Sequence, residues 1–86
     1  MDRVVFVLTA HAQVVLRERA IELEWVERVL SQPERTAWDR DDPALRHALG
    51  AIPERDGRIL RVVYDPGVRP WRVVTAFFDR RERRLP

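Results

Sequence analysis

Histidine and arginine are the side chains of this sequence best suited to act on a phosphate group. The chain contains two histidines, and all sixteen of its basic residues are arginines. RNA is cleaved without a metal when its own 2′-hydroxyl attacks the neighbouring phosphate. That step needs a base, an acid and cations that hold the developing negative charge. Histidine exchanges protons near neutral pH, and arginine presents a fork of donors to phosphate. The candidates for such chemistry are His11, Arg19, Arg61 and Thr75.

Each candidate also has a structural explanation, and the sequence leaves both readings open. His11 can cap or pack against the start of a helix, and Arg19 can reach the last carbonyls of that helix or an acidic residue of the next one. Arg61 and Thr75 can form an ordinary cross-strand pair. His47 lies in a strand whose facing the pattern does not decide, and it is the weakest of the candidates.

Composition and spacing exclude several other kinds of site. The chain has no cysteine, which removes disulfides, thiolate zinc sites and cysteine nucleophiles. Its histidines lack the spacing of metal ligands, and Ser31 lacks the glycine elbow of a hydrolase nucleophile. The three glycines form no phosphate-binding loop. The sequence therefore predicts neither a metal nor a cofactor.

Positive charge is concentrated at the C-terminal end. Residues 69–86 carry six arginines and two acidic residues, a balance of +4, so the rest of the chain sums to −2 within a net charge of +2. One basic end on a nearly neutral body suggests an anionic partner there, and a solvated tail is the alternative. Three tryptophans could stack on bases, although aromatic residues in so small a domain more often lie in the core: Trp25, Trp38 and Trp71.

Two short helices must position the first two candidates. Residues 3–8 favour a strand, after which Thr9 suits the N-cap of a helix that runs to about Ala20. Within that helix Arg19 falls inside the arc of apolar residues at helical spacing. A second helix is expected from residue 22 until Pro33 stops it. With only a turn between them, the two helices are expected to form an antiparallel hairpin.

The rest of the sequence is typical of β-structure. We expect a short strand around Thr36 and Trp38, then strands over residues 46–53, 57–65 and 71–79. The loop 66–70 joins the last two strands as a hairpin, which pairs Val62 with Val74 and Arg61 with Thr75. One sheet face then packs on the helices through Leu60, Val62, Tyr64, Val74, Ala76 and Phe78.

The opposite face of this predicted hairpin is half apolar and half cationic. It carries Arg61 beside Thr75 at its centre, with apolar neighbours around them: Ile59, Val63, Trp71, Val73 and Phe77. Such a face is not expected to lie against bulk water without a purpose. It could hold a partner helix, a nucleic acid or a second copy of the chain.

The length of 86 residues allows one domain with one modest core, over residues 1–86, in which 80–86 form a frayed basic tail. The sequence shows no signal peptide, and its longest apolar run near the N-terminus is too short to cross a bilayer. We therefore expect a cytoplasmic protein without a membrane partner.

Short motifs follow one another in a fixed order over about residues 5–80: Thr9-x-His11-Ala12, Arg19-x-Ile21, Val26, Leu30, Pro33, Leu60-x-Val62-Val63 and Val73-Val74-Thr75. Together they resemble a bacterial domain-of-unknown-function family, DUF4258-like, which is close to BrnT-type toxins and usually grouped with the RelE/ParE toxin superfamily. The resemblance implies an α+β fold of RelE-like order, β-α-α-β-β-β(β), with a helical hairpin on one face of an antiparallel sheet. Ala20 stands where that family commonly has glycine, and Glu22 where a Ser or Thr cap is common.

The resemblance also implies a function. It predicts the toxin of a type II toxin–antitoxin pair, typically a metal-independent mRNA endonuclease, with a cognate antitoxin and RNA or the ribosome as partners. The matched positions place His11, Arg19 and Thr75 in the site; the sheet geometry adds Arg61 and the basic end adds Arg80. The chain lacks the lysine and the exposed tyrosine that better-known nucleases of the superfamily use. A non-catalytic protein- or nucleic-acid-binding module of the same fold, and a homodimer that pairs open faces or edge strands, remain as alternatives.

Overall fold

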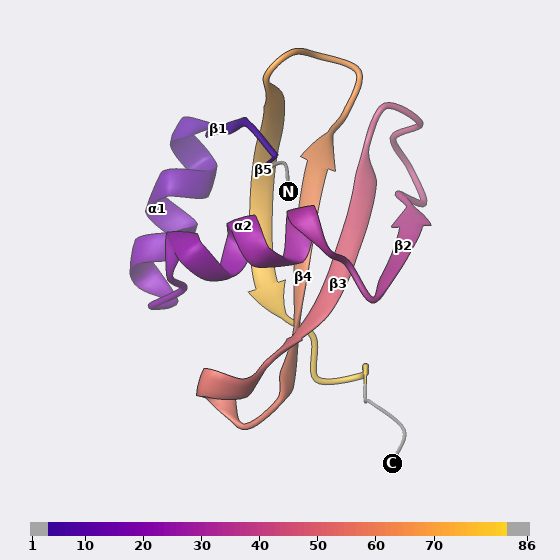
Figure 1. Cartoon of the computed structure of the whole chain (residues 1–86). Coiled ribbons are helices and arrows are strands. Elements are labelled where there is room, and N and C mark those ends of the chain that lie inside the picture. Colours follow the sequence, from indigo (N-terminus) through magenta and orange to yellow (C-terminus); the bar gives the residue numbers. More distant parts are fainter. Residues whose placement is uncertain (1–3, 83–86) are drawn as a thin grey trace.

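The computed structural model describes residues 4–82, which fold into two helices and a five-stranded mixed sheet. This confirms the predicted α+β class, and each predicted strand and helix is present (Figure 1). In chain order the elements are β1 (Phe6–Leu8), α1 (Ala10–Glu18), α2 (Leu23–Ser31), β2 (Arg35–Trp38), β3 (Arg46–Ile52), the short 3-10 helix η1 (Pro53–Arg55), β4 (Arg58–Asp65) and β5 (Trp71–Phe78). None of the helices in these residues is long and apolar enough to cross a membrane.

The strands lie in the order β1-β5-β4-β3-β2. Strands β2 to β5 pair antiparallel with their neighbours, but β1 pairs parallel with β5. The prediction of a purely antiparallel sheet was therefore wrong at one edge. β1 and β5 are the first and last strands of the chain, and the long connection between them removes the constraint that a short hairpin imposes.

The register of β4 against β5 differs from the predicted one by two residues. Arg61 lies opposite Phe77, and Thr75 lies opposite Val63, so Arg61 and Thr75 are diagonal neighbours rather than a direct pair. An irregularity between Val63 and Tyr64 then shifts the register by one residue. A sequence pattern of period two does not reveal such a bulge, because the bulge inserts one extra residue into one strand only.

The bulge also changes the face on which the start of β5 lies. Val73 is fully buried in the helix-side core, and Trp71 stacks on Tyr64 with 4.9 Å between ring centroids. The prediction that Trp71 and Val73 lie on the face opposite the helices was therefore wrong. Tyr64 lies on the core side, as predicted.

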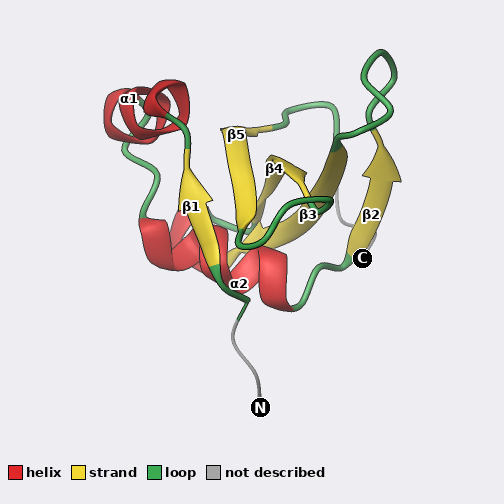
Figure 2. Ribbon diagram, turned by 90° about the horizontal axis from the view of Figure 1, so that it is seen from above, coloured by secondary structure: helices red, strands yellow, loops and turns green. Residues whose placement is uncertain are grey.

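The main core lies between the helices and one face of the sheet. α2 crosses β3 and β4, while α1 packs on β5 (Figure 2). The buried apolar side chains of α2 belong to this core. Gly50 of β3 faces α2 so closely that an added Cβ would lie 3.3 Å from a methyl carbon of Val29. The buried cluster contains Ala12, Leu16, Ile21, Trp25, Val26, Val29, Leu30, Ala48, Ile52, Leu60, Val62, Tyr64, Val73 and Ala76.

The two helices do not form the predicted antiparallel hairpin. α2 runs across the strands, whereas α1 lies along the edge of β5 (Figure 1). At the N-terminus of α1 the Thr9 hydroxyl accepts from the Ala12 amide at 3.0 Å, which confirms the predicted cap. The direction changes at Ala20, which has a left-handed φ of 54°, and the buried side chain of Ile21 then anchors the turn. A tight left-handed turn and one buried residue are enough to redirect the chain.

The sheet face opposite α2, here called the distal face, is organised in rows of directly paired residues. Because side chains alternate along a strand, the residues beside Gly50 and Val62 point away from α2. One row runs Ala37, His47, Val63 and Thr75. The next row runs Arg35, Leu49, Arg61 and Phe77.

Candidate functional site

Three polar side chains on the distal face form a continuous chain of hydrogen bonds. Nε2 of His47 lies 2.7 Å from Oδ1 of Asp39, and Nδ1 of His47 lies 2.8 Å from Nη1 of Arg61. A guanidinium only donates, so Nδ1 must accept the hydrogen bond from Arg61. The proton of the imidazole is then on Nε2, where it is donated to Asp39. His47 is neutral in this arrangement.

The strand register brings Arg61 and His47 together. His47 lies opposite Val63 and Arg61 lies opposite Leu49, so the two polar residues are diagonal neighbours on β3 and β4. Diagonal neighbours are within reach of long side chains. Both side chains are largely buried, with 16% of His47 and 14% of Arg61 exposed.

Asp39 is held in place by the loop that follows β2. Its Oδ2 accepts from the backbone amides of Asp41 at 3.1 Å and Asp42 at 2.9 Å, while Oδ1 accepts from His47. The hydrogen bond from His47, helped by the two amides, lowers the pKa of Asp39. A carboxylate fixed in this way orients the imidazole and selects the tautomer in which Nδ1 is the basic nitrogen.

Two more carboxylates satisfy the remaining donors of Arg61. Its Nε donates to Asp79 at 2.9 Å and its Nη2 donates to Glu82 at 3.2 Å. Burial by itself raises the pKa of Asp79, but the amide of Arg81 and the guanidinium of Arg61 together outweigh it, so the net shift is downward. Asp79 is only 3% exposed and Glu82 is 30% exposed. We call these side chains the Arg61 network: Asp39, His47, Arg61, Asp79 and Glu82.

The segment after β5 forms a turn at residues 80–82. The amide of Asp79 donates to the Ile59 carbonyl at 2.9 Å, and the amide of Glu82 donates to the Asp79 carbonyl at 3.2 Å. Residues 80–82 of the predicted frayed tail lie in this turn, where Asp79 and Glu82 bind Arg61. The remaining part of the predicted tail, residues 83–86, lies outside the described residues.

A groove lies beside the Arg61 network. It has a volume of about 780 Å³, and its walls include the guanidinium-bearing Arg58 and Arg80 as well as two carboxylates of the network. The full lining is Asp56, Gly57, Arg58, Ile59, Asp79, Arg80 and Glu82. The groove thus carries both arginines and carboxylates that bind Arg61. Its volume is large enough for a nucleotide-sized ligand.

Three of the five residues predicted from the sequence gather around this network. Arg61 is its centre, and Arg80 is an exposed residue of the adjoining groove. Thr75 lies in the row of His47 with Val63 between them. The backbones of Thr75 and His47 are two strand spacings apart, roughly 10 Å.

The other two predicted residues lie elsewhere. His11 is exposed near the start of α1, and Arg19 is at its C-cap, so the helix separates them. Nη1 of Arg19 donates to the Ala76 carbonyl of β5 at 2.9 Å. The hypothesis that Arg19 reaches a site containing His11 is not supported. β1 pairs with only the first part of β5, which leaves the Ala76 carbonyl on the open edge of that strand. The guanidinium of Arg19 satisfies this carbonyl, which explains why an arginine lies within the apolar arc of α1.

From the sequence, His47 was the weakest candidate, and Asp39 and Asp79 were not candidates. His47 and Arg61 are fourteen residues apart, so only the register of β3 against β4 shows that they meet. Asp39 and Asp79 each follow directly after a strand, and this position was the one available signal. Within residues 4–82 no group of three or more acidic or histidine side chains is arranged to hold a metal ion.

The tryptophans divide between core and surface. Trp25 is buried in the helix-side core, and Trp71 packs against that core. Trp38 on β2 is 66% exposed, and the guanidinium carbon of Arg46 lies 4.6 Å from its ring centroid. Trp38 is therefore the most exposed of the three tryptophans.

Comparison with known proteins identifies a family without an assigned activity. The sequence profile of the domain of unknown function DUF4258 matches residues 8–78. No curated protein and no solved structure matches the chain. The matched segment begins at the end of β1 and ends with β5, so it includes both helices and the strands that carry His47 and Arg61. The chain belongs to the DUF4258 family.

Proposed function

We propose that this protein is a metal-independent endoribonuclease that acts as the toxin of a type II toxin–antitoxin pair. The observation that carries the proposal is the hydrogen-bonded series Asp39–His47–Arg61 on the distal face. It combines an oriented imidazole with a cation, which supply the base and the positive charge that attack by a 2′-hydroxyl requires. The resemblance to RelE-type toxins supports the biological role.

The proposed reaction begins when Arg61 turns from His47 to a phosphate oxygen of bound RNA. That movement frees Nδ1 of His47, while Asp39 keeps the proton on Nε2. Nδ1 then takes the proton of the 2′-hydroxyl as its oxygen attacks the adjacent phosphorus. Arg61 holds the negative charge on the phosphorane oxygens. Breakage of the bond to the 5′-oxygen leaves a 2′,3′-cyclic phosphate, and water protonates the leaving oxygen.

The groove beside the network gives the RNA a place to lie. Arg58 and Arg80 line it, so they are positioned to contact phosphates that flank the reacting one. Thr75, which shares the distal face, is a candidate for contact with the ribose. In this proposal the antitoxin covers the same face and withholds it from RNA.

A non-catalytic binding module is the alternative, and one observation favours it. Nε, Nη1 and Nη2 of Arg61 each already bind a partner within the chain, so the network is closed in the absence of RNA. In this alternative, the closed network has no role beyond stabilising the distal face. The alternative predicts that removal of the imidazole changes stability but has no effect on cells or RNA.

Induction in a bacterium provides the first test. Wild type, His47→Asn and His11→Asn are expressed under tight control, with the amount of folded protein matched. The asparagine at 47 can still accept from Arg61 but cannot act as a base. We expect growth arrest with wild type and His11→Asn and normal growth with His47→Asn, because His11 lies outside the network.

Three results would contradict the proposal. They are arrest by His47→Asn equal to that of wild type, arrest that depends on His11 alone, and no arrest by any of the folded proteins. Melting curves of the purified variants control for loss of folding.

A further inference from the structure

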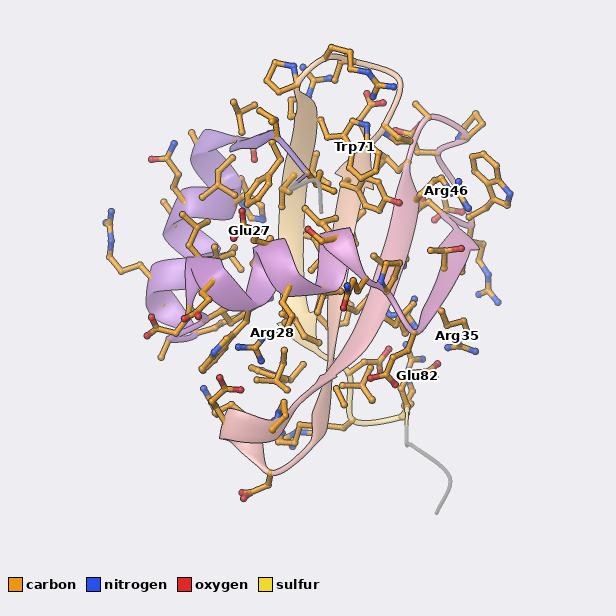
Figure 3. The ribbon with its side chains drawn as sticks, in the orientation of Figure 1. Glu27, Arg28, Arg35, Arg46, Trp71 and Glu82 are labelled. Carbon is orange, nitrogen blue, oxygen red and sulfur yellow. The ribbon has the colours of Figure 1, made fainter. Side chains whose placement is uncertain are left out.

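Two arginines of the distal face hold one carboxylate between them. Glu82 forms an ion pair with Nη2 of Arg35, and through its other oxygen it accepts from Nη2 of Arg61 at 3.2 Å. Arg35 comes from β2 and Glu82 from the turn after β5 (Figure 3). Arg61 comes from β4. A single anionic group thus joins three parts of the chain that are far apart in sequence.

The sheet itself, rather than Glu82, sets the spacing of the two arginines. Arg35 pairs with Leu49, and Leu49 pairs with Arg61, so the arginines lie in one row on either side of an apolar side chain. Two strand spacings separate their backbones by roughly 10 Å. Two guanidinium groups that converge across such a gap are suited to one anion with several acceptor oxygens.

Glu82 is the least firmly held member of the Arg61 network. It is 30% exposed and its partner Arg35 is 57% exposed, whereas Asp79 on the same guanidinium is 3% exposed. Within residues 4–82, the backbone of Glu82 makes one hydrogen bond, from its amide to the Asp79 carbonyl. Glu82 can therefore leave both arginines while Asp79 stays on Nε of Arg61.

We propose that Arg35 and Arg61 form a binding site for a phosphate of single-stranded RNA, and that Glu82 occupies this site in the free protein. The identity of the ligand rests on the proposed ribonuclease function. A phosphodiester offers the same anionic oxygens as the carboxylate, and its binding would displace Glu82 into the adjoining groove, which Glu82 already lines. Glu82 thereby sets the affinity for RNA, because each binding event must first release it.

The test uses a probe that the protein cannot cleave. A fluorescent single-stranded oligonucleotide with 2′-O-methyl groups at every position is titrated with the full chain, and binding is read by anisotropy. If Glu82 fills the site about nine-tenths of the time, Glu82→Gln tightens binding about tenfold. Arg35→Gln weakens it by a similar factor through loss of a charge-assisted phosphate contact.

Charge-matched controls come from the exposed ion pair of Arg28 with Glu54, which joins α2 to η1 away from the distal face. Glu54→Gln and Arg28→Gln change the net charge by the same amounts as the two test variants. They are expected to shift the affinity by less than about twofold, because screening weakens distant charges.

The outcomes separate this inference from the ribonuclease proposal. Tighter binding in Glu82→Gln without cleavage of ordinary RNA would support the phosphate site and reject the nuclease. Cleavage by wild type with equal affinities for Glu82→Gln and Glu54→Gln would overturn the phosphate site alone. Preferential binding of a polyglutamate peptide over the oligonucleotide by Glu82→Gln would also overturn it, because the occupant would then be an acidic protein.

Discussion

At the scale of single residues, His47 owes its potential chemistry to its two neighbours. Arg61 donates to Nδ1 and Asp39 accepts from Nε2, so one tautomer is selected without any bound ligand. The sequence favoured His11 and made His47 the weakest candidate, because the pattern did not decide which way the strand of His47 faces. Only the pairing of Leu49 with Arg61 places His47, and not His11, beside the cation. A contact between residues on different strands depends on register, which local pattern does not determine.

Acid sensitivity belongs to this scale because it follows from one carboxylate. The folded pKa of Asp79 lies below the ordinary value of 3.8, despite burial, because the Arg81 amide and Arg61 favour its charged form. Its contribution to stability is therefore complete above the unfolded pKa and is lost as pH falls through the folded one. We expect the free energy of unfolding to fall more steeply in wild type than in Asp79→Asn between neutral pH and about pH 3. Urea titrations at several pH values measure this, and parallel curves would contradict it.

At the scale of elements, the sequence predicted which residues form each helix better than it predicted how the two helices run relative to each other. The apolar spacing and the Thr9 cap placed α1 and α2 correctly, because these signals act within a few residues. The angle between the helices depends on the turn at Ala20 and on the anchoring of Ile21 in the core. The bulge beside Tyr64 also escaped prediction, because β-branched residues continue through it without a break.

The left-handed turn at Ala20 gives a prediction about α1. A residue with a Cβ pays roughly 1 kcal/mol or more at this φ of 54°, and glycine does not. We expect Ala20→Gly to raise the free energy of unfolding by about 1 kcal/mol. Ala12→Gly, the same change within the helix and the core, should lower it by at least about 1 kcal/mol. Denaturant unfolding compares the two, and a loss of stability in Ala20→Gly would show that the turn carries no strain.

At the scale of the whole molecule, the two faces of the sheet are covered by different kinds of residues. Helices and apolar side chains cover one face, whereas the Arg61 network and the turn after β5 cover much of the other. The predicted half-apolar, half-cationic face is present only in part, because Val63 and Phe77 lie beside Arg61 and Thr75 there, whereas Trp71 and Val73 belong to the other side. The charge of Arg61 is neutralised by carboxylates of the chain itself. Composition showed the basic residues of the C-terminal end, yet it could not show that Asp79 and Glu82 fold back onto Arg61, since that contact spans eighteen to twenty-one residues.

Variants of the buried pair Arg61 and Asp79 test how strongly the turn after β5 is held on the distal face. Arg61→Met leaves a carboxylate that is 3% exposed without its main cation, and we expect a loss of about 3–5 kcal/mol in the free energy of unfolding. The double variant with Asp79→Asn removes that unpaired charge and should recover most of the loss. A double-mutant cycle in urea measures the coupling. A double variant as unstable as the single one would contradict an ionic role for this pair.

We propose that the Asp39–His47–Arg61 series cleaves RNA without a metal. Incubation of the purified protein with RNA in excess chelator, with the ends of the products identified by mass, tests this directly. We expect 2′,3′-cyclic phosphate ends from wild type, and a rate reduced by about 10²-fold or more in folded His47→Asn. RNA that stays intact with wild type, or that is cleaved equally fast by His47→Asn, would contradict it.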